Sequence, residues 1–183
     1  MPSVIGLFPR LVYKDILAVS DEYNNSLRNE IERIFDTGNI DRETKTFISN
    51  AELISNTIPS SPNLNILRGI IKEHINIFAE INGRGKKYDI IDMWATVAKK
   101  GQHHAIHAHG PIHLVGVYYI QIPSDHEFSI DFMCPNTFLL KQSHSEEIRS
   151  KTLILFDGAL SHGFEPNPSN TRRIAIAFNA LEV

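Results

Sequence analysis

Histidines cluster in the segment 101–113, GQHHAIHAHGPIH, which holds five of the nine histidines of the chain. A neutral imidazole offers a nitrogen lone pair near neutral pH, so histidine is a frequent ligand of transition metals. In an extended segment alternate side chains point the same way, and His107 and His109 can therefore present two imidazoles on one face. This spacing predicts a metal chelate.

A third ligand has to come from elsewhere, and His162 in the segment FDGALSHG (156–163) is the best candidate. It follows the apolar run 153–156 and precedes a loop rich in Pro and Asn, so we expect it at a strand end, where chemistry is usually placed. We predict a metal site made of His107, His109 and His162. Three other histidines are interpreted as surface or satisfied core residues, namely His74, His126 and His144, and His103 and His104 are interpreted as part of a solvated turn.

Composition is that of an ordinary soluble globular protein, with 42% hydrophobic and 21% charged residues in 183. A formal net charge of −3 gives no electrostatic footprint for nucleic acid or an anionic membrane. No segment approaches the roughly 18–20 apolar residues of a membrane helix, and the N-terminus has no signal-peptide pattern. The single cysteine, Cys134, fits a reducing compartment, and we expect a cytoplasmic protein.

Hydrophobic spacing predicts two amphipathic helices, over 20–35 with a cap at Ser20 and over 62–81. From about residue 88 the sequence pattern changes to short β-like runs separated by turns. We therefore expect an α+β protein dominated by β structure, a single domain with a helical part at about 1–87 and a β-rich metal-binding core at about 88–183. The expected strands are 4–13, 46–48, 89–98, 114–122, 129–133, 136–140, 153–156, 162–164 and 172–179.

The last of these strands separates two kinds of side chain. Its alternation places Ile174, Ile176 and Phe178 on one face, and Arg173 on the other with Ala175, Ala177 and Asn179. An arginine beside small residues could bind a carboxylate in a cavity through its bidentate fork, or could form a surface ion pair, and the two readings stand equal.

Aromatic residues leave a second choice open. Tyr118 and Tyr119 point to opposite faces of their strand, so one of them should enter the core, where a buried hydroxyl wants a partner. Trp94 is interpreted as a core residue in preference to a pocket wall.

The motifs WATV (94–97), Gly101, HAHG (107–110), GVYY (116–119), LF (155–156), LSH (160–162) and RIAIAFN (173–179), with the opening LFP (7–9), occur in a specific order. In this order and spacing the chain resembles the 2-oxoglutarate (2OG), Fe(II)-dependent oxygenases of bacteria and many bacteriophages. The resemblance covers most of the chain from about residue 88.

The resemblance implies a double-stranded β-helix, a cupin-like jelly roll, with helices supporting one sheet. It implies Fe(II), 2OG as co-substrate and O2, with His107 and His162 as iron ligands and Arg173 gripping the far carboxylate of 2OG. Tyr119 would make a second contact to that carboxylate, with Tyr118 in reserve. The expected reaction is hydroxylation of an unidentified small molecule or protein side chain, in a bacterium or a phage-infected cell.

One position departs from the usual His-x-Asp pattern of that superfamily, because His109 occupies the acidic position. Three neutral imidazoles leave Fe(II) its full double charge, whereas an aspartate removes one unit. Either His109 is the third ligand, or it lies behind the ligands and water completes the coordination.

Other readings of the same residues compete. Gly101, His107, His109 and His113 nearly reproduce the first motif of a cupin, with His162 in the second, and a cupin needs no 2OG and gives Arg173 no task. A zinc hydrolase could also use three histidines, but no general base accompanies them. A barrel without metal that serves as a binding module is the reading outside enzymes.

Overall fold

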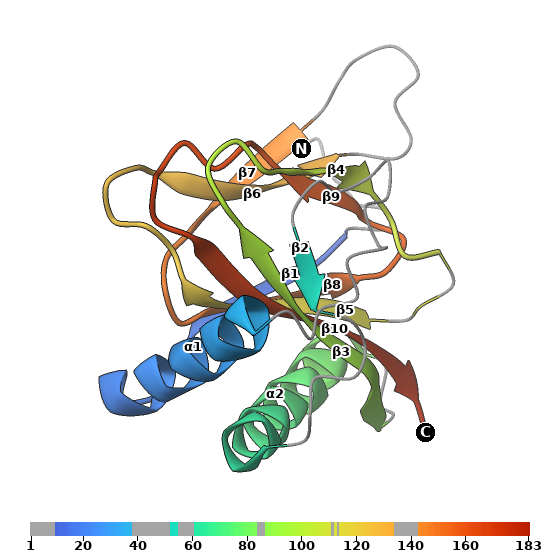
Figure 1. Cartoon of the computed structure of the whole chain (residues 1–183). Helices are drawn as coiled ribbons and strands as arrows, with labels where there is room; N and C mark the ends of the chain where they lie inside the picture. Colours follow the sequence, from blue (N-terminus) through green and yellow to red (C-terminus); the bar gives the residue numbers. More distant parts are fainter. Residues whose placement is uncertain are drawn as a thin grey trace.

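The structure is a computed structural model, and it describes residues 10–37, 52–54, 61–83, 87–110, 112, 114–133 and 143–183. Two helices and ten strands lie in these residues (Figure 1). In chain order they are β1 (Val12–Ile16), α1 (Asp21–Asp36), β2 (Glu52–Ile54), α2 (Pro62–Ile81), β3 (Tyr88–Ala98), β4 (His104–His107), β5 (Leu114–Gln121), β6 (Phe128–Met133), β7 (Ser143–Ile148), β8 (Thr152–Asp157), β9 (Ser161–Phe164) and β10 (Arg173–Glu182).

Both helices begin at a serine that satisfies a free backbone N–H group. The Ser20 hydroxyl accepts a hydrogen bond from the Tyr23 backbone at 3.1 Å, and two acidic residues follow in the first turn of α1. Ser61 does the same for Leu64 at 3.1 Å, with Pro62 opening α2. The two predicted helices and the cap at Ser20 are confirmed, with α1 ending one residue later than expected.

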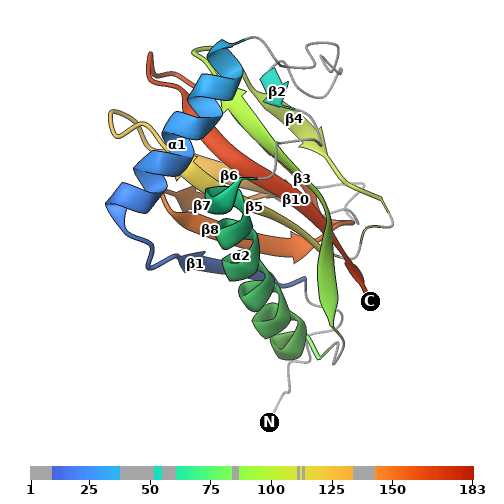
Figure 2. The same cartoon turned by 60° about the horizontal axis from the view of Figure 1, so that its bottom comes forward.

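The strands form two antiparallel sheets that face each other. The six-stranded sheet has the order β1-β8-β5-β10-β3-β2, and the four-stranded sheet has the order β4-β9-β6-β7. Figures 1 and 2 show α1 and α2 lying across the outer face of the six-stranded sheet, so that its inner face is left for the smaller sheet. This is the predicted jelly roll, an α+β protein that is mainly β.

Strand β10 lies between β5 and β3, and its alternation divides two apolar cores. Ile174, Ile176 and Phe178 pack with the helices in the outer core, while Ala175 packs with residues of the inner core between the sheets. Gly116 on β5 makes room for this arrangement, since a Cβ there would lie 2.2 Å from the ring of Phe178. The predicted division of β10 into two faces is confirmed.

Several strand predictions differ from the structure. Strand β7 was not expected, because its sequence SHSEEI is polar and mostly exposed, and it forms by pairing with β6 along its whole length. Within the described residues β1 spans Val12–Ile16, where the predicted strand ended at 13, and β10 continues to Glu182, where the predicted strand ended at 179. The predicted pieces 4–9, 46–48 and 136–140 lie outside the described residues, as do Cys134 and His113.

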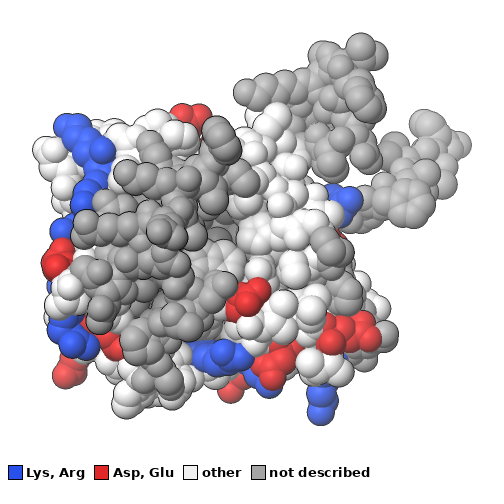
Figure 3. Space-filling model, turned by 45° about the vertical axis from the view of Figure 1, so that its right-hand side comes forward, with Lys and Arg blue, Asp and Glu red and all other residues white. Residues whose placement is uncertain are grey.

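The surface carries charges of both signs. Figure 3 shows lysine and arginine side chains interspersed with aspartate and glutamate along the described part of one face. Neither α1 nor α2 is long and apolar enough to cross a membrane, and these are the helices of the described chain.

Candidate metal centre

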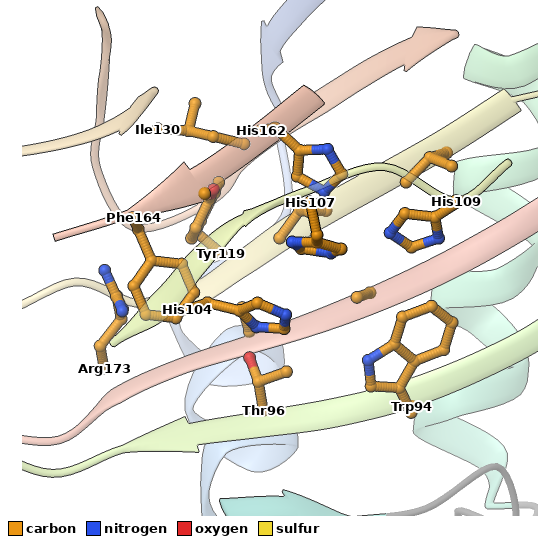
Figure 4. Close-up of a pocket in the computed structure, with 15 residues that line it drawn as sticks. Trp94, Thr96, His104, His107, His109, Tyr119, Ile130, His162, Phe164 and Arg173 are labelled. Carbon is orange, nitrogen blue, oxygen red and sulfur yellow. The ribbon is translucent and has the colours of Figure 1, made fainter. Parts of the chain in front are cut away.

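The three histidines predicted as ligands come together in the space between the sheets (Figure 4). His107 is the last residue of β4 and lies directly opposite His162 of β9, while His109 follows two residues after the strand. Each residue offers one ligand atom, and these atoms lie within 4.8 Å of one another. Two adjacent strands and a turn therefore hold three imidazoles around one point.

Backbone carbonyls fix the tautomers of two of these rings. His107 Nδ1 donates to the Ala105 carbonyl at 2.9 Å, and His162 Nδ1 donates to the Leu160 carbonyl at 3.0 Å. A carbonyl oxygen can only accept, so each Nδ1 carries the proton and each Nε2 keeps its lone pair. Both rings are therefore prepared to bind a metal through Nε2.

His109 is oriented by side chains instead. Its Nδ1 lies 2.7 Å from Oδ1 of Asn179 on β10, and Trp94 stacks on its ring with the centroids 6.1 Å apart. Its backbone N–H donates to the carbonyl of Gly158 at 2.9 Å, which anchors the turn after β4. The sequence placed Asn179 on this face of β10, but nothing local in the sequence connected it with His109.

Burial keeps all three imidazoles neutral. It lowers the pKa of His162 to about 3, with a further contribution from the adjacent His107. Burial is also the main cause of the lowered pKa of His107 and of His109. Three neutral nitrogen donors with their lone pairs free are a donor set that suits a divalent transition metal such as Fe(II), so the residues present fit the ion that the sequence implies.

A glycine permits the close approach of β9 to β4. A Cβ on Gly163 would lie 2.7 Å from the carbonyl oxygen of His104 and 2.9 Å from the backbone nitrogen of Ile106. Any side chain at this position would push the two strands apart. Gly163 therefore keeps His162 next to His107.

The histidines line a pocket whose side chains enclose about 520 Å³, part of it open to solvent. Its walls come from β3, β5 and β10 on one side and from β4, β6 and β9 on the other. Most of the lining is apolar, and among the described lining residues there is no carboxylate and no lysine.

Arg173 lies at the opposite end of this pocket from Trp94 (Figure 4). The residue is only 3% exposed, and its guanidinium carbon lies 3.2 Å from the centroid of the Phe164 ring. Its Nη2 is buried and has no hydrogen-bond partner among the described residues. Burial lowers the pKa of Arg173 to about 10, so the group is still a cation at neutral pH. An unpaired buried cation of this kind calls for an anionic ligand.

The two tyrosines point in opposite directions, as the alternation of β5 predicts. Tyr119 is buried among the residues that line the pocket, and burial raises the pKa of its phenol, which therefore stays protonated. Tyr118 lies on the helix side, where its hydroxyl donates to Oδ1 of Asn24 at 2.8 Å. Only Tyr119 can contact a ligand in the pocket.

Two residues of the site were interpreted wrongly from the sequence. His104 was placed in a solvated turn, but it begins β4, lines the pocket and stacks on His107 with the centroids 4.3 Å apart. Burial lowers its pKa to about 3. Trp94 was interpreted as a core residue, whereas it forms a wall of the pocket beside Thr96. A local pattern could not reveal either placement, because each depends on which strands become neighbours.

His74, His126 and His144 were interpreted as surface or satisfied core residues, and each lies beside a polar partner away from the three candidate ligands. His74 Nδ1 shares a hydrogen bond of 2.7 Å with the Tyr13 hydroxyl, and His144 Nε2 lies 3.0 Å from Oε2 of Glu146. His126 lies beside Asp125 in an exposed turn. None of the three lines the pocket.

Comparison with known proteins bears on the whole arrangement. A family model described as "Putative 2OG-Fe(II) oxygenase" matches residues 92–179, the segment that carries every residue named above as a candidate ligand. No curated protein sequence matches the chain.

Solved structures share the fold at low identity. A prolyl-4-hydroxylase from Pseudomonas putida is 12% identical, with 92% of this chain and 91% of that chain covered and a TM-score of 0.69. The non-heme α-ketoglutarate-dependent epimerase SnoN from nogalamycin biosynthesis is 8% identical, with 93% and 76% covered and a TM-score of 0.74. The viral collagen prolyl hydroxylase of Paramecium Bursaria Chlorella virus-1, solved as its 2OG complex, is 17% identical, with 92% and 94% covered and a TM-score of 0.64. At these identities the likeness establishes the jelly-roll fold.

Proposed function

We propose roles for the residues of the site on the following premise. The match of the family model to residues 92–179 assigns this chain to the 2OG-Fe(II) oxygenase family, whose members are oxidoreductases that use Fe(II) and 2OG. His107, His109 and His162 hold the iron through Nε2. Arg173 binds the far carboxylate of 2OG, and the Tyr119 hydroxyl donates a second hydrogen bond to it. The substrate, a small molecule or a protein side chain, is hydroxylated in the same pocket.

One observation carries this proposal, namely the buried cation in the pocket of the three histidines. A charged donor that is left unpaired inside a protein is costly, and an apolar side chain of similar size would fill the same space without that cost. Nη2 of Arg173 has no partner in the described protein, and its side chain reaches the pocket wall. A dicarboxylate with one end on the metal and the other on the guanidinium would satisfy both sites at once.

The residues of the pocket divide the work in a simple way. When bound, Fe(II) supplies the activation of O2 that accompanies oxidative decarboxylation of 2OG. The backbone carbonyls behind His107 and His162 keep those rings in the tautomer that can bind the ion. Arg173 and Tyr119 fix the orientation of the co-substrate, and the apolar walls exclude water. Trp94 lines the end away from Arg173, and we place the substrate there.

The described lining favours oxidation over metal-dependent hydrolysis. A hydrolase with three histidine ligands needs a general base, and the described lining contains no carboxylate that could serve. Two of the structures that share the fold are named as prolyl hydroxylases and the third is named as an epimerase, and hydroxylation is the reaction that we propose for this chain.

We further propose that the chain acts as one domain in the cytoplasm of a bacterium or a phage-infected cell. The pairing of β1 with β8 supports a single unit, since it joins the helical part at about 1–87 to the β-rich core at about 88–183. The single cysteine supports a reducing compartment.

Anaerobic titration of the Fe(II)-loaded protein with 2OG tests the proposal. Chelation of Fe(II) by the keto acid produces a weak visible charge-transfer band in enzymes of this superfamily, and we expect this band for the wild type and for Arg172→Ala. Arg172 is a matched control because it is the adjacent arginine but pairs on the surface, 3.0 Å from Oδ1 of Asp36. Arg173→Ala should weaken the band and the affinity for 2OG.

A band of equal strength in Arg173→Ala would remove the carboxylate role of this residue. Iron binding without any band in the wild type would favour the alternative of a cupin that does not use 2OG.

A further inference from the structure

The three candidate ligands differ in what holds them. His107 and His162 are held by backbone carbonyls, whereas His109 is held by the side chain of Asn179. Behind Asn179 lies a carboxylate, since Nδ2 of Asn179 donates to Oδ2 of Asp92 at 3.2 Å. A chain of two hydrogen bonds thus joins Asp92 to the ring of His109.

The direction of both hydrogen bonds follows from elementary chemistry. A carboxylate can only accept, so the amide nitrogen of Asn179 must face Asp92 and the amide oxygen must face His109. The oxygen then accepts the proton of His109 Nδ1, at 2.7 Å, and Nε2 keeps its lone pair. Asp92 therefore sets the orientation of the amide, and the amide sets the tautomer of the imidazole.

The backbone makes this arrangement rigid. Asn179 and Asp92 are directly opposite residues of the hydrogen-bonded strands β10 and β3, and the pairing register shifts immediately after Asn179. Such irregularities often redirect a side chain beside a functional site. Trp94, two residues after Asp92 and therefore on the same face of β3, stacks on the ring of His109.

We infer that Asp92 and Asn179 are positioning residues that hold His109 as a metal ligand and keep, two hydrogen bonds away, the negative charge that a directly coordinating aspartate would bring. This inference rests on the proposed role of His109. Partners that hydrogen-bond to a ligand histidine typically contribute about 10–100-fold to metal affinity. In a His-x-Asp site the carboxylate coordinates the metal itself, whereas here the carboxylate of Asp92 on β3 accepts a hydrogen bond from Asn179.

The test uses two measurements on the full chain. Nitrogen-15 NMR of the histidine rings in the metal-free protein reports the tautomer of His109, and titration with Co(II) alone, followed by visible absorption, reports metal affinity. The wild type should show His109 protonated at Nδ1. Asn179→Leu, which is similar in size, should give a mixture of tautomers and a Kd for Co(II) that is about 10–100-fold higher.

Isosteric variants separate charge from hydrogen bonding. Asp92→Asn retains an acceptor for the Asn179 amide and should keep the tautomer, with a Kd less than about tenfold higher. The exchange Asp92→Asn with Asn179→Asp places the carboxylate directly on His109 and should bind Co(II) at least as tightly as the wild type. Asp89→Asn is the matched control, a carboxylate of the same strand that pairs with Lys72 on the surface, and it should leave both readouts unchanged.

The outcomes distinguish this inference from the proposed ligand set. The inference about Asp92 and Asn179 would be overturned if Asn179→Leu kept the tautomer and a Kd within about twofold of wild type while His109→Ala lost Co(II). The proposed ligand set would then remain intact. Unchanged Co(II) binding in His109→Ala would overturn the ligand set itself. If Asp89→Asn weakened Co(II) binding as much as Asp92→Asn, the effect would be one of general charge, and the inference about Asp92 and Asn179 would also be overturned.

Discussion

Replacing Arg173 by methionine should make the protein more stable when 2OG is absent and less stable than the wild type when 2OG is present. Arg173 is 3% exposed, and its Nη2 has no hydrogen-bond partner among the described residues. Methionine is flexible and apolar, so it can fill the same space between Phe164 and the pocket wall without a buried charge. The prediction concerns the sign of the change, which reverses with the ligand.

The magnitude follows from two opposing contributions. An unsatisfied buried donor costs about 1–3 kcal/mol, and methionine removes this cost. The contact of the guanidinium with the ring of Phe164, at 3.2 Å from the centroid, is worth about 1 kcal/mol and is lost. We therefore expect Arg173→Met to raise the free energy of unfolding by about 1 kcal/mol, or to raise Tm by roughly 2–4 °C for a chain of this size.

Adding 2OG should invert the order. At a concentration 100 times its Kd, a ligand that binds only the folded state stabilises it by about 2.7 kcal/mol. The wild type loaded with Co(II) should gain this amount, and Arg173→Met should gain almost nothing because the carboxylate has lost its partner. The wild type would then be the more stable protein by about 2 kcal/mol.

Calorimetric melting of both proteins, loaded with Co(II) and measured with and without 2OG, checks the prediction. Arg172→Met is the control, and its exposed pair with Asp36 should change stability by less than about 0.5 kcal/mol. The reasoning is refuted if Arg173→Met is less stable than the wild type by 1 kcal/mol or more without 2OG, or if 2OG stabilises both proteins equally.

Three further predictions concern the residues around the pocket. The metal-free protein should lose stability as the pH falls from about 6.5 to 5, because burial lowers the pKa of His162 to about 3 and only the unfolded chain takes up the proton in this range. In urea unfolding, His162→Gln should reduce the dependence of the free energy of unfolding on pH by up to about 1.4 kcal/mol per pH unit. Gly163→Ala should lower the free energy of unfolding in urea by about 1–3 kcal/mol and weaken Co(II) binding. The control Gly69→Ala, in an open position on α2, should raise the free energy of unfolding by about 0.5–1 kcal/mol. Equal effects of the two variants would argue against the tight approach of β9 to β4. Tyr118→Phe should lower the free energy of unfolding by about 1–2 kcal/mol and leave the affinity for 2OG unchanged. Tyr119→Phe should weaken 2OG binding about tenfold in calorimetric titration. The reverse pattern would exchange the roles of the two tyrosines.

Features that depend on a short stretch of sequence could be predicted. The helix spanning Pro62–Ile81 follows from apolar residues at helical spacing, and the separation of Arg173 from Ile174 follows from the two-residue period of a strand. The same period shows that Tyr118 and Tyr119 face opposite ways. It does not show which of them faces the pocket, because that depends on which face of the sheet the helices cover.

Features that depend on strand neighbours could not be predicted. His104 was interpreted as a turn residue, and it lines the pocket because β4 pairs with β9. The contact of Asp92 with Asn179 joins residues 87 positions apart through the pairing of β3 with β10. Strand β7 has no apolar alternation, and its pairing with β6 compensates for its weak local preference.

The central place of β10 affects how the chain can fold as it is made. Strands β3 and β5 leave the ribosome before β10, and about 50 residues separate the end of β5 from the start of β10. At the usual 5–20 residues per second, β5 waits roughly 3–10 seconds, and β3 waits longer, for the partner that lies between them. During this interval the edges that will pair with β10 are unpaired, which favours association with other chains. Yield in a foreign host should therefore rise at lower protein concentration and with chaperones that shield unpaired strands, even when no residue of the pocket is changed.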